Sequence, residues 1–92
     1  MAGDKRHARL RFRSWHRGTR EMDLLLGSFA DTHLHAFTPE QLDCYEALLQ
    51  ESDPDLYDWI TGVQPVPAPH TSPVMEMLSR HRFGNFSSAK NL

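Results

Sequence analysis

Hydrophobic residues recur along this chain every three or four positions, which is the spacing of one face of an α-helix. In the first such segment, about residues 6–15, we expect Ala8, Phe12 and Trp15 to form the buried side. The next segment begins near Thr19 and continues into the low thirties. Its predicted buried side consists of Met22, Leu25, Leu26, Phe29 and Ala30. The pattern therefore predicts two amphipathic helices at the start of the chain.

Two glycines interrupt these patterns. Gly18 lies between the two predicted helices, where a residue without a side chain permits a tight junction. Gly27 falls inside the second helix, where glycine costs about 1 kcal/mol relative to alanine. An unbroken second helix and a helix interrupted at Gly27 both fit the sequence.

The third helix has a clear N-terminal signal. Thr38 is its predicted N-cap, Pro39 takes the first helical position, and Gln41 follows three residues after the cap. We expect this helix to end near Glu51. Its predicted buried stripe consists of Leu42, Tyr45, Leu48 and Leu49.

The fourth helix repeats this arrangement. Asp53 is the predicted N-cap, Pro54 takes the first position, and Asp55 lies in the first turn, where the helix dipole favours an anion. Gly62 suits the C-terminal end. The predicted buried face consists of Leu56, Trp59 and Ile60.

Residues 63–73 contain four prolines and predict a polyproline-like connector over the surface. Thr71 or Ser72 then caps a last helix, which Gly84 ends. Its predicted apolar side consists of Val74, Met77 and Leu78. The predicted fold is all-α, a small five-helix bundle that forms a single domain over residues 1–84. Residues 85–92 are predicted to be a flexible, dispensable tail.

Charge is distributed unevenly, although the net charge is only −2. Between Glu21 and Glu76 there are eleven acidic residues and neither Lys nor Arg. Seven cations occupy the first twenty residues, namely Lys5, Arg6, Arg9, Arg11, Arg13, Arg17 and Arg20. Three interpretations fit: a basic helix packed near an acidic body, a partner steered by charge, and nucleic-acid binding.

Several classes of protein are disfavoured. The apolar runs are too short to span a membrane, so we expect no membrane insertion. The basic N-terminus lacks the apolar segment of a secretory signal, and a motif starting at Arg17 leaves no room for a mitochondrial presequence. The single cysteine, Cys44, excludes an internal disulfide and fits a reducing compartment. We therefore expect a cytoplasmic bacterial protein.

Catalytic and metal sites are not expected. His33 and His35 would point apart on a helix, and the remaining histidines have no ligand spacing. The aspartates between Asp53 and Asp58 lack the glycine and glutamate of a calcium loop. Cys44 has no activating context on a helix. The sequence therefore favours a protein that binds over one that catalyses a reaction.

Two segments remain as candidate recognition elements. The first is Arg17-Gly18-Thr19-Arg20-Glu21-Met22-Asp23, and the second is Ser52-Asp53-Pro54-Asp55-Leu56-Tyr57-Asp58-Trp59-Ile60. In a structural interpretation, Gly18 is an N-cap and the Glu21 carboxylate bonds back to it. In a functional interpretation, Gly18 allows a partner's backbone to approach while Arg17 and Glu21 present opposite charges. Trp59 is either a core residue or an interface anchor.

Together the two segments resemble the small bacterial and mitochondrial assembly factors that promote covalent attachment of FAD to the flavoprotein subunit of succinate dehydrogenase. The resemblance covers roughly residues 6–80. It implies that Arg17, Gly18 and Glu21 contact that flavoprotein. Arg20 and Asp23 belong to the commoner extended form of the motif and are expected to take part.

The resemblance implies a non-catalytic assembly factor that binds this flavoprotein, and also that of fumarate reductase, before the iron–sulfur subunit joins. The covalent bond then forms between a histidine of the client and the flavin methyl carbon, so the chemistry belongs to the client and its flavin. Because the chain has no phosphate-binding glycine loop, we expect it to have no cofactor of its own and FAD to be held by the client. We expect a monomer.

Two other functions are alternatives. A nucleic-acid-binding module would use the Arg-rich first helix, although the acidic remainder would repel phosphate. An antitoxin-like regulatory protein is the second, because members of the family that the chain resembles have been labelled antitoxins.

Overall fold

The computed structural model describes residues 2–81, with side chains from residue 5 onward. Within this range the chain is all-α, as predicted, with five α-helices and no strand. The elements are α1 (Ala2–Trp15), α2 (Arg20–His33), the 3-10 helix η1 (Leu34–Ala36), α3 (Pro39–Leu49), α4 (Asp53–Thr61), the 3-10 helix η2 (Ala68–His70) and a last helix at 73–81. The predicted stop at Gly84 and the predicted tail at 85–92 lie outside the described residues.

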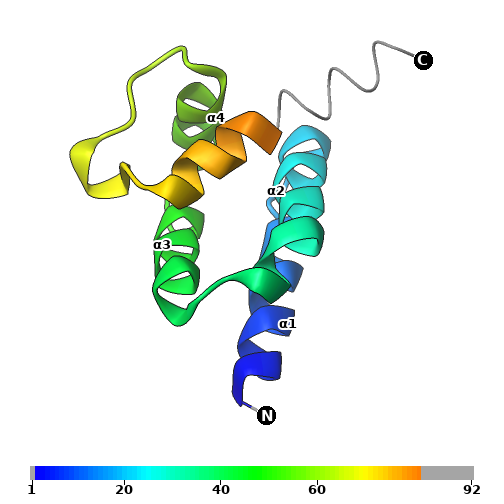
Figure 1. Ribbon diagram of the computed structural model, residues 1–92. Helices are drawn as coiled ribbons and strands as arrows, with labels where there is room; N and C mark the ends of the chain where they lie inside the picture. Colours follow the sequence, from blue (N-terminus) through cyan, green and yellow to red (C-terminus); the bar gives the residue numbers. More distant parts are fainter. Residues whose placement is uncertain (1, 82–92) are drawn as a thin grey trace.

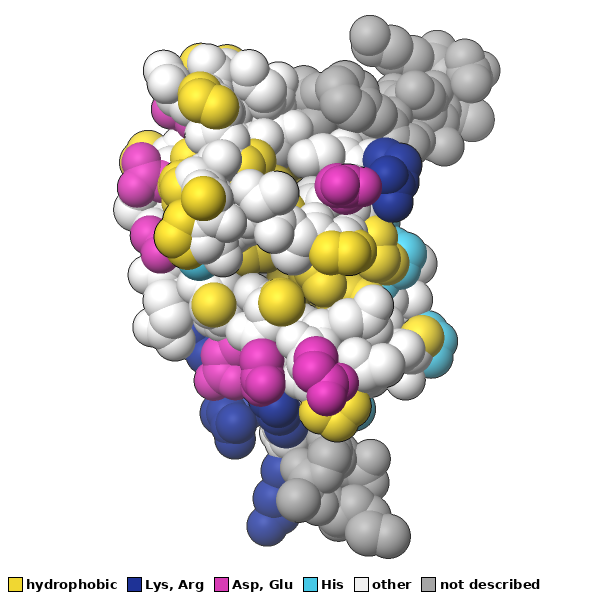
Figure 2. Space-filling view, turned by 60° about the vertical axis from the view of Figure 1, so that its left-hand side comes forward, with side chains coloured by type: hydrophobic (Ala, Val, Ile, Leu, Met, Phe, Trp, Pro, Cys, Tyr) yellow, Lys and Arg dark blue, Asp and Glu magenta, His cyan; other side chains and the backbone are white. Residues whose placement is uncertain are grey.

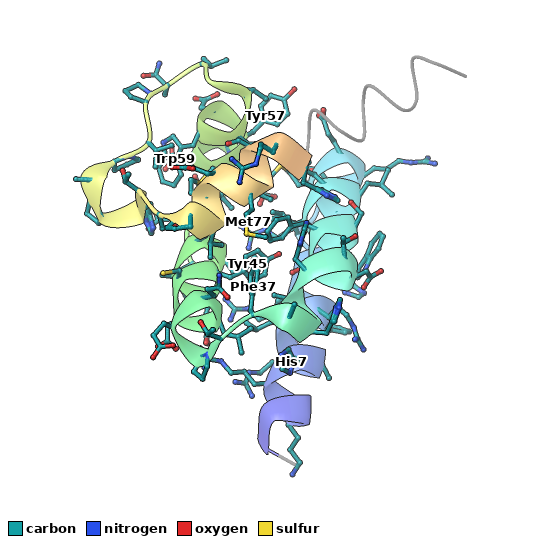
Figure 3. All side chains as sticks on the ribbon, viewed as in Figure 1. His7, Phe37, Tyr45, Tyr57, Trp59 and Met77 are labelled. Atoms are coloured by element: carbon teal, nitrogen blue, oxygen red, sulfur yellow. The ribbon has the colours of Figure 1, made fainter. Side chains whose placement is uncertain are left out.

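The helices enclose one hydrophobic core. Figure 1 shows α1 behind α2 on one side, α3 on the other, and α4 with the last helix across one end. Tyr45 and Phe37 point into the space between these layers, where Met77 of the last helix also lies (Figure 3). The side chains with the least exposure are Tyr45, Phe29, Leu10, Leu26, Leu34, Leu48, Leu56, Ile60, Leu78 and Val74.

The buried side of α1 differs from the predicted one. Ala8 is exposed and Phe12 is 63% exposed, whereas Leu10 and Ser14 are fully buried. Ser14 is buried because its hydroxyl lies 2.6 Å from that of Tyr45 on α3, and the two share a hydrogen bond. Ser14 also reaches the Leu10 carbonyl at 2.8 Å, so burial leaves the hydroxyl satisfied. On this helix the polar residue Ser14 is therefore part of the core, whereas the hydrophobic residue Phe12 is not.

The prediction for Trp15 is closer to the structure, because its ring packs against α2. It lies where a side chain at Gly27 would otherwise be, and its indole N–H donates to Asp31 at 3.3 Å. Gly27 is buried and helical, so α2 continues through it without a break. The glycine is present because α1 and α2 approach closely at this point.

Two caps agree with the sequence and one does not. Thr38 and Gln41 form the predicted capping box of α3, and Gly62 ends α4 in the left-handed conformation with a φ of +83°. The predicted N-cap Asp53 is wrong. Ser52 caps α4 by accepting from the Asp55 N–H at 3.3 Å, which leaves the Asp53 carboxylate available for another partner.

The proline-rich connector is more structured than predicted. It contains η2, and His70 at the end of this turn lies 2.9 Å from the Glu51 carboxylate and 5.3 Å from the Trp59 ring. Val66 packs against the core. Ser72, one of the two predicted caps, accepts from the Met75 N–H and opens the last helix. The connector therefore follows the surface but is held to α3 and α4.

The uneven charge of the sequence is largely satisfied inside the molecule. Arg6 of α1 lies 2.6 Å from Asp43 and 3.0 Å from Glu46 on α3, and Arg13 lies 3.7 Å from Glu46. Figure 2 shows acidic and basic side chains next to each other at one end of the described part of the molecule. Arg11 also approaches Asp31, at 3.9 Å. The basic helix is thus packed on acidic helices, which was the simplest of the three interpretations.

Gly27 gives a test of the α1–α2 packing. We expect Gly27→Ala to lower the free energy of unfolding by about 1–3 kcal/mol, because the new methyl group collides with the Trp15 ring. Helix propensity alone would instead raise stability by up to about 1 kcal/mol. The sign of the change in urea denaturation therefore separates the two effects, and a stabilised variant would contradict the packing described here.

A histidine pair gives a second test. His33 and His81 lie 5.7 Å apart beside Phe29. Burial, together with the nearby His35 for His33 and the nearby His33 for His81, lowers both pKa values below 6.5. At mildly acidic pH the unfolded chain therefore binds more protons than the folded chain. The contribution of the two neutral rings to folding stability is present above the unfolded pKa and is lost as pH falls.

We expect the melting temperature to fall between about pH 7.5 and pH 5.5. His33→Gln should show a smaller fall over the same range, because it removes one of the two rings. A wild-type melting temperature that rises on acidification would contradict this account.

Candidate partner-binding surface

The turn between α1 and α2 is built around Gly18. Its φ of +116° lies in the left-handed region that favours glycine. The residue is exposed, and a Cβ atom built on it would meet no atom within 4 Å. Glycine is therefore needed here for backbone conformation, and the side of the turn on which a side chain would stand is open.

Asp23 and Thr19 hold this turn in shape. One carboxylate oxygen of Asp23 accepts from the backbone N–H of Arg17 at 2.6 Å and from that of Gly18 at 3.2 Å. The Thr19 hydroxyl accepts from the Met22 N–H at 3.3 Å and caps α2. Charge-assisted hydrogen bonds of this kind are among the stronger ones in proteins. Asp23 thus acts on the shape of the turn from inside the chain.

The structural interpretation of Glu21 was wrong. Thr19 is the N-cap in place of Gly18, because its backbone is extended and its hydroxyl reaches the third helical N–H. Glu21 consequently stands in the second helical position and is exposed. Among residues 5–81 its carboxylate has neither a hydrogen bond nor an ion pair, and the same holds for the exposed Arg20. Both charges are available to a partner.

Arg17 points into the protein, and its side chain is only 11% exposed. Its Nε donates to the Asp53 carboxylate at 2.8 Å. Its two terminal nitrogens donate to the carbonyls of Leu49 and Glu51, each at 2.7 Å. The Leu49 carbonyl ends α3 and would otherwise lack a helical partner, and the Glu51 carbonyl lies in the link between α3 and α4. We call this set of bonds the Arg17 clamp.

The clamp brings the two sequence motifs together. Arg17 comes from the first motif and Asp53 from the second, so the two segments meet inside one hydrogen-bonded unit. Residue spacing could not predict this contact, because Arg17 and Asp53 are far apart in the sequence. The sequence had instead suggested that Asp53 caps its own helix. The resemblance implied a contact between Arg17 and a partner, and the structure instead shows its guanidinium engaged within the chain.

Beside Gly18 the surface forms an open depression of about 550 Å³. Its lining consists of Trp15, His16, Gly18, Thr19, Arg20, Asp23 and Leu24. Leu24, which the sequence did not single out, is 52% exposed. Trp59 does not line this depression, because it packs partly buried against the core and the connector (Figure 3). The structure therefore gathers the Gly18 motif at one surface and leaves Trp59 elsewhere.

The arrangement is suited to recognition. Opposite charges, from Arg20 and Glu21, flank an open stretch of backbone on a rigid turn. Among residues 2–81, no three His, Cys, Asp or Glu side chains are grouped to hold a metal ion. Burial raises the pKa of Tyr45, which keeps this core hydroxyl neutral. In the described part of the chain, no helix has the length and apolar character needed to cross a bilayer.

Comparison with known proteins now adds the family. Residues 8–82 match the sequence model of a family described as Sdh5, flavinator of succinate dehydrogenase. The chain belongs to the Sdh5 family. The match covers most of the chain, so the resemblance inferred from the two motifs is confirmed.

Relatives of the Sdh5 family come from mitochondria and from bacteria. A Dictyostelium discoideum protein, named succinate dehydrogenase assembly factor 2, mitochondrial, is 40% identical over 85% of this chain and 55% of its own length. The Candida glabrata protein of the same name is 51% identical over 70% of this chain and 44% of its own length. The FAD assembly factor SdhE of Acetobacter pasteurianus is 38% identical over 79% of this chain and 67% of its own length.

This chain thus spans about half the length of the mitochondrial relatives and two thirds of the bacterial one. Because relatives of both origins match, a cytoplasmic bacterial location stays a prediction.

The Arg17 clamp gives a test by stability. We expect Arg17→Ala to lower the free energy of unfolding by about 2–3 kcal/mol, because it leaves carbonyls and a carboxylate without their charged donor. Asp53→Ala should cost roughly 1–2 kcal/mol. In the double variant the two losses should be less than additive by at least about 0.5 kcal/mol.

Arg20→Ala is the matched control, because this arginine in the same motif is exposed and has no partner among residues 5–81. Its effect should stay within about 0.5 kcal/mol. Fully additive losses for Arg17 and Asp53 in chemical denaturation would show that the clamp is not formed in solution.

Proposed function

We propose that this protein is an assembly factor that binds the flavoprotein subunit of succinate dehydrogenase and promotes covalent attachment of FAD to it. Membership of the Sdh5 family supports the proposal, as do the names of relatives that match most of the chain. The observation that carries it is the open Gly18 turn, where Arg20 and Glu21, neither of which has an ion pair among residues 5–81, are presented on a preformed surface.

In this proposal some residues of the motif contact the client and others stabilise the turn. Gly18 lets the client's backbone approach, and Glu21 and Arg20 meet groups of opposite charge on the client. Arg17 and Asp23 hold the turn in shape through the bonds described above. A surface that is already ordered loses little conformational entropy on binding, which favours a small factor that must act on a much larger protein.

The protein itself is not a catalyst in this proposal. FAD is held by the client, and the histidine that becomes linked to the flavin also belongs to the client. The factor binds one client conformation more tightly than the others and so raises the population in which histidine and flavin are in reactive geometry. The flavoprotein of fumarate reductase is a second client by the same reasoning.

Nucleic-acid binding is less well supported. Arg6, Arg11, Arg13 and Arg17, four of the seven early cations, face carboxylates of the same chain. A phosphate backbone would have to compete with these internal partners. The Arg-rich helix thus serves the fold first.

The proposal is tested directly by flavin fluorescence of the denatured client after gel electrophoresis. Cells that lack this protein should yield flavoprotein with little covalent flavin, and cells that express it should restore the signal. A client that is equally flavinylated in both strains would overturn the proposal.

Gly18 and Gly62 provide a matched pair of variants. Both have positive φ, and neither would bring a Cβ atom within 4 Å of another atom. We therefore expect Gly18→Arg and Gly62→Arg to lose similar stability, about 1–3 kcal/mol from backbone strain. Only Gly18→Arg should abolish capture of the purified flavoprotein, because only its new side chain stands on the proposed contact surface.

Glu21→Gln extends the test to charge. Its loss should weaken the complex by roughly 2 kcal/mol or more, because a cation of the client would be left unpaired. Glu40→Gln, in the exposed first turn of α3, should bind normally. If Gly18→Arg and Gly62→Arg bound the flavoprotein as well as the wild-type protein does, the contact surface would lie elsewhere.

A further inference from the structure

An exposed apolar patch adjoins the Gly18 turn. Among residues 5–81 only three large hydrophobic side chains are strongly exposed, and two of them are here: Phe12 at 63% and Leu24 at 52%. The third, Val63 at 65%, follows the far end of α4 from Asp53. Single exposed hydrophobic residues are common, so the placement of two beside an open glycine is the informative point.

His16 makes the patch continuous. Its ring stacks on Phe12, with centroids 3.9 Å apart and planes 18° from parallel, and its Nδ1 lies 2.6 Å from the Phe12 carbonyl. His16 lines the depression beside Gly18 together with Leu24. It also lines a second hollow with Phe12 on the other side. The three side chains therefore form one surface across α1 and α2.

The stack and the hydrogen bond give Phe12 and His16 a defined geometry relative to each other. Phe12 and His16 are one helical turn apart, and a ring pair held by a stack and a hydrogen bond has few other rotamers to lose. Aromatic side chains that are rigid before binding are the usual anchors of protein interfaces. Phe12 and His16 thus have the properties of an interface anchor, although neither belongs to the Gly18 motif.

Charges around the patch indicate what it fits. Arg9 stands one turn before Phe12 and Arg20 one turn before Leu24, and both are exposed with no ion pair among residues 5–81. Two carboxylates also lie here, but that of Asp23 already accepts from the backbone of the turn, and Glu21 is the exposed one. The cations of the described rim are therefore available to acidic groups of a partner. A complementary partner would present an apolar side chain surrounded by acidic groups.

We propose that the client-binding surface extends from Gly18 over Phe12, His16 and Leu24, and that this patch receives an apolar side chain of the client flavoprotein flanked by acidic residues. The inference rests on the proposed function and adds the part of the surface that supplies apolar contact. The charged groups of the motif select and orient the client, and the patch supplies much of the affinity.

The experiment titrates purified flavoprotein subunit into wild-type protein and into three single variants, Phe12→Ser, Leu24→Ser and Val63→Ser. We expect the first two to bind roughly tenfold more weakly or worse, because each removes an apolar group that the complex buries. Val63→Ser should bind within about twofold of wild type. All three should keep the wild-type melting temperature, since none is buried.

Arg20→Glu serves as the charge variant and should weaken binding further at low salt than at high salt. Sedimentation of the free protein is run alongside. A dimer that Phe12→Ser converts to a monomer would show that a second copy covers the patch, and this would overturn the inference.

The outcomes separate the two proposals. If the wild-type protein binds the flavoprotein and Gly18→Arg does not, while Phe12→Ser and Leu24→Ser bind normally, the proposed function stands and the apolar patch is not part of the contact. If the wild-type protein does not bind at all, the proposed function fails and the inference fails with it.

Discussion

A nearly buried guanidinium organises this small protein. Removing a charge from water is costly unless other hydrogen bonds replace those to water. The Arg17 side chain donates to the Asp53 carboxylate, to the carbonyl of the last residue of α3 and to the Glu51 carbonyl in the link to α4. If Asp53 or either carbonyl moved away, the nearly buried guanidinium would lose a hydrogen-bond acceptor. The turn between α1 and α2 is therefore tied to the junction between α3 and α4, and the position of Gly18 depends on this contact.

This division of roles explains how so short a motif serves both folding and recognition. Arg17 and Asp23 face inward and define the backbone, whereas Arg20 and Glu21 face outward from the same turn. The inward pair makes the outward pair rigid, and rigidity is what a binding surface requires when it has no chemistry of its own to offer.

Apolar spacing and capping signals predicted the five helices well, because both depend on residues that are close together in the sequence. Errors arose where a distant residue decided the outcome. Ser14 is buried because Tyr45 of α3 supplies a hydroxyl, and the Asp53 carboxylate bonds to the distant Arg17 while Ser52 caps α4. The same limit applied to the site: motif residues were identifiable, but their inward or outward direction and the exposed Phe12 and Leu24 depended on the folded chain.

The two tryptophans are placed so that they report on different parts of the molecule. Trp15 lines the depression beside Gly18, so its emission spectrum should respond to whatever occupies that surface. Trp59 lies against the His70 ring of the connector, so its emission should respond to that contact instead. Replacing either indole by phenylalanine leaves a single tryptophan. The chain thus contains its own optical probe for association and a separate one for the integrity of the connector, without any added label.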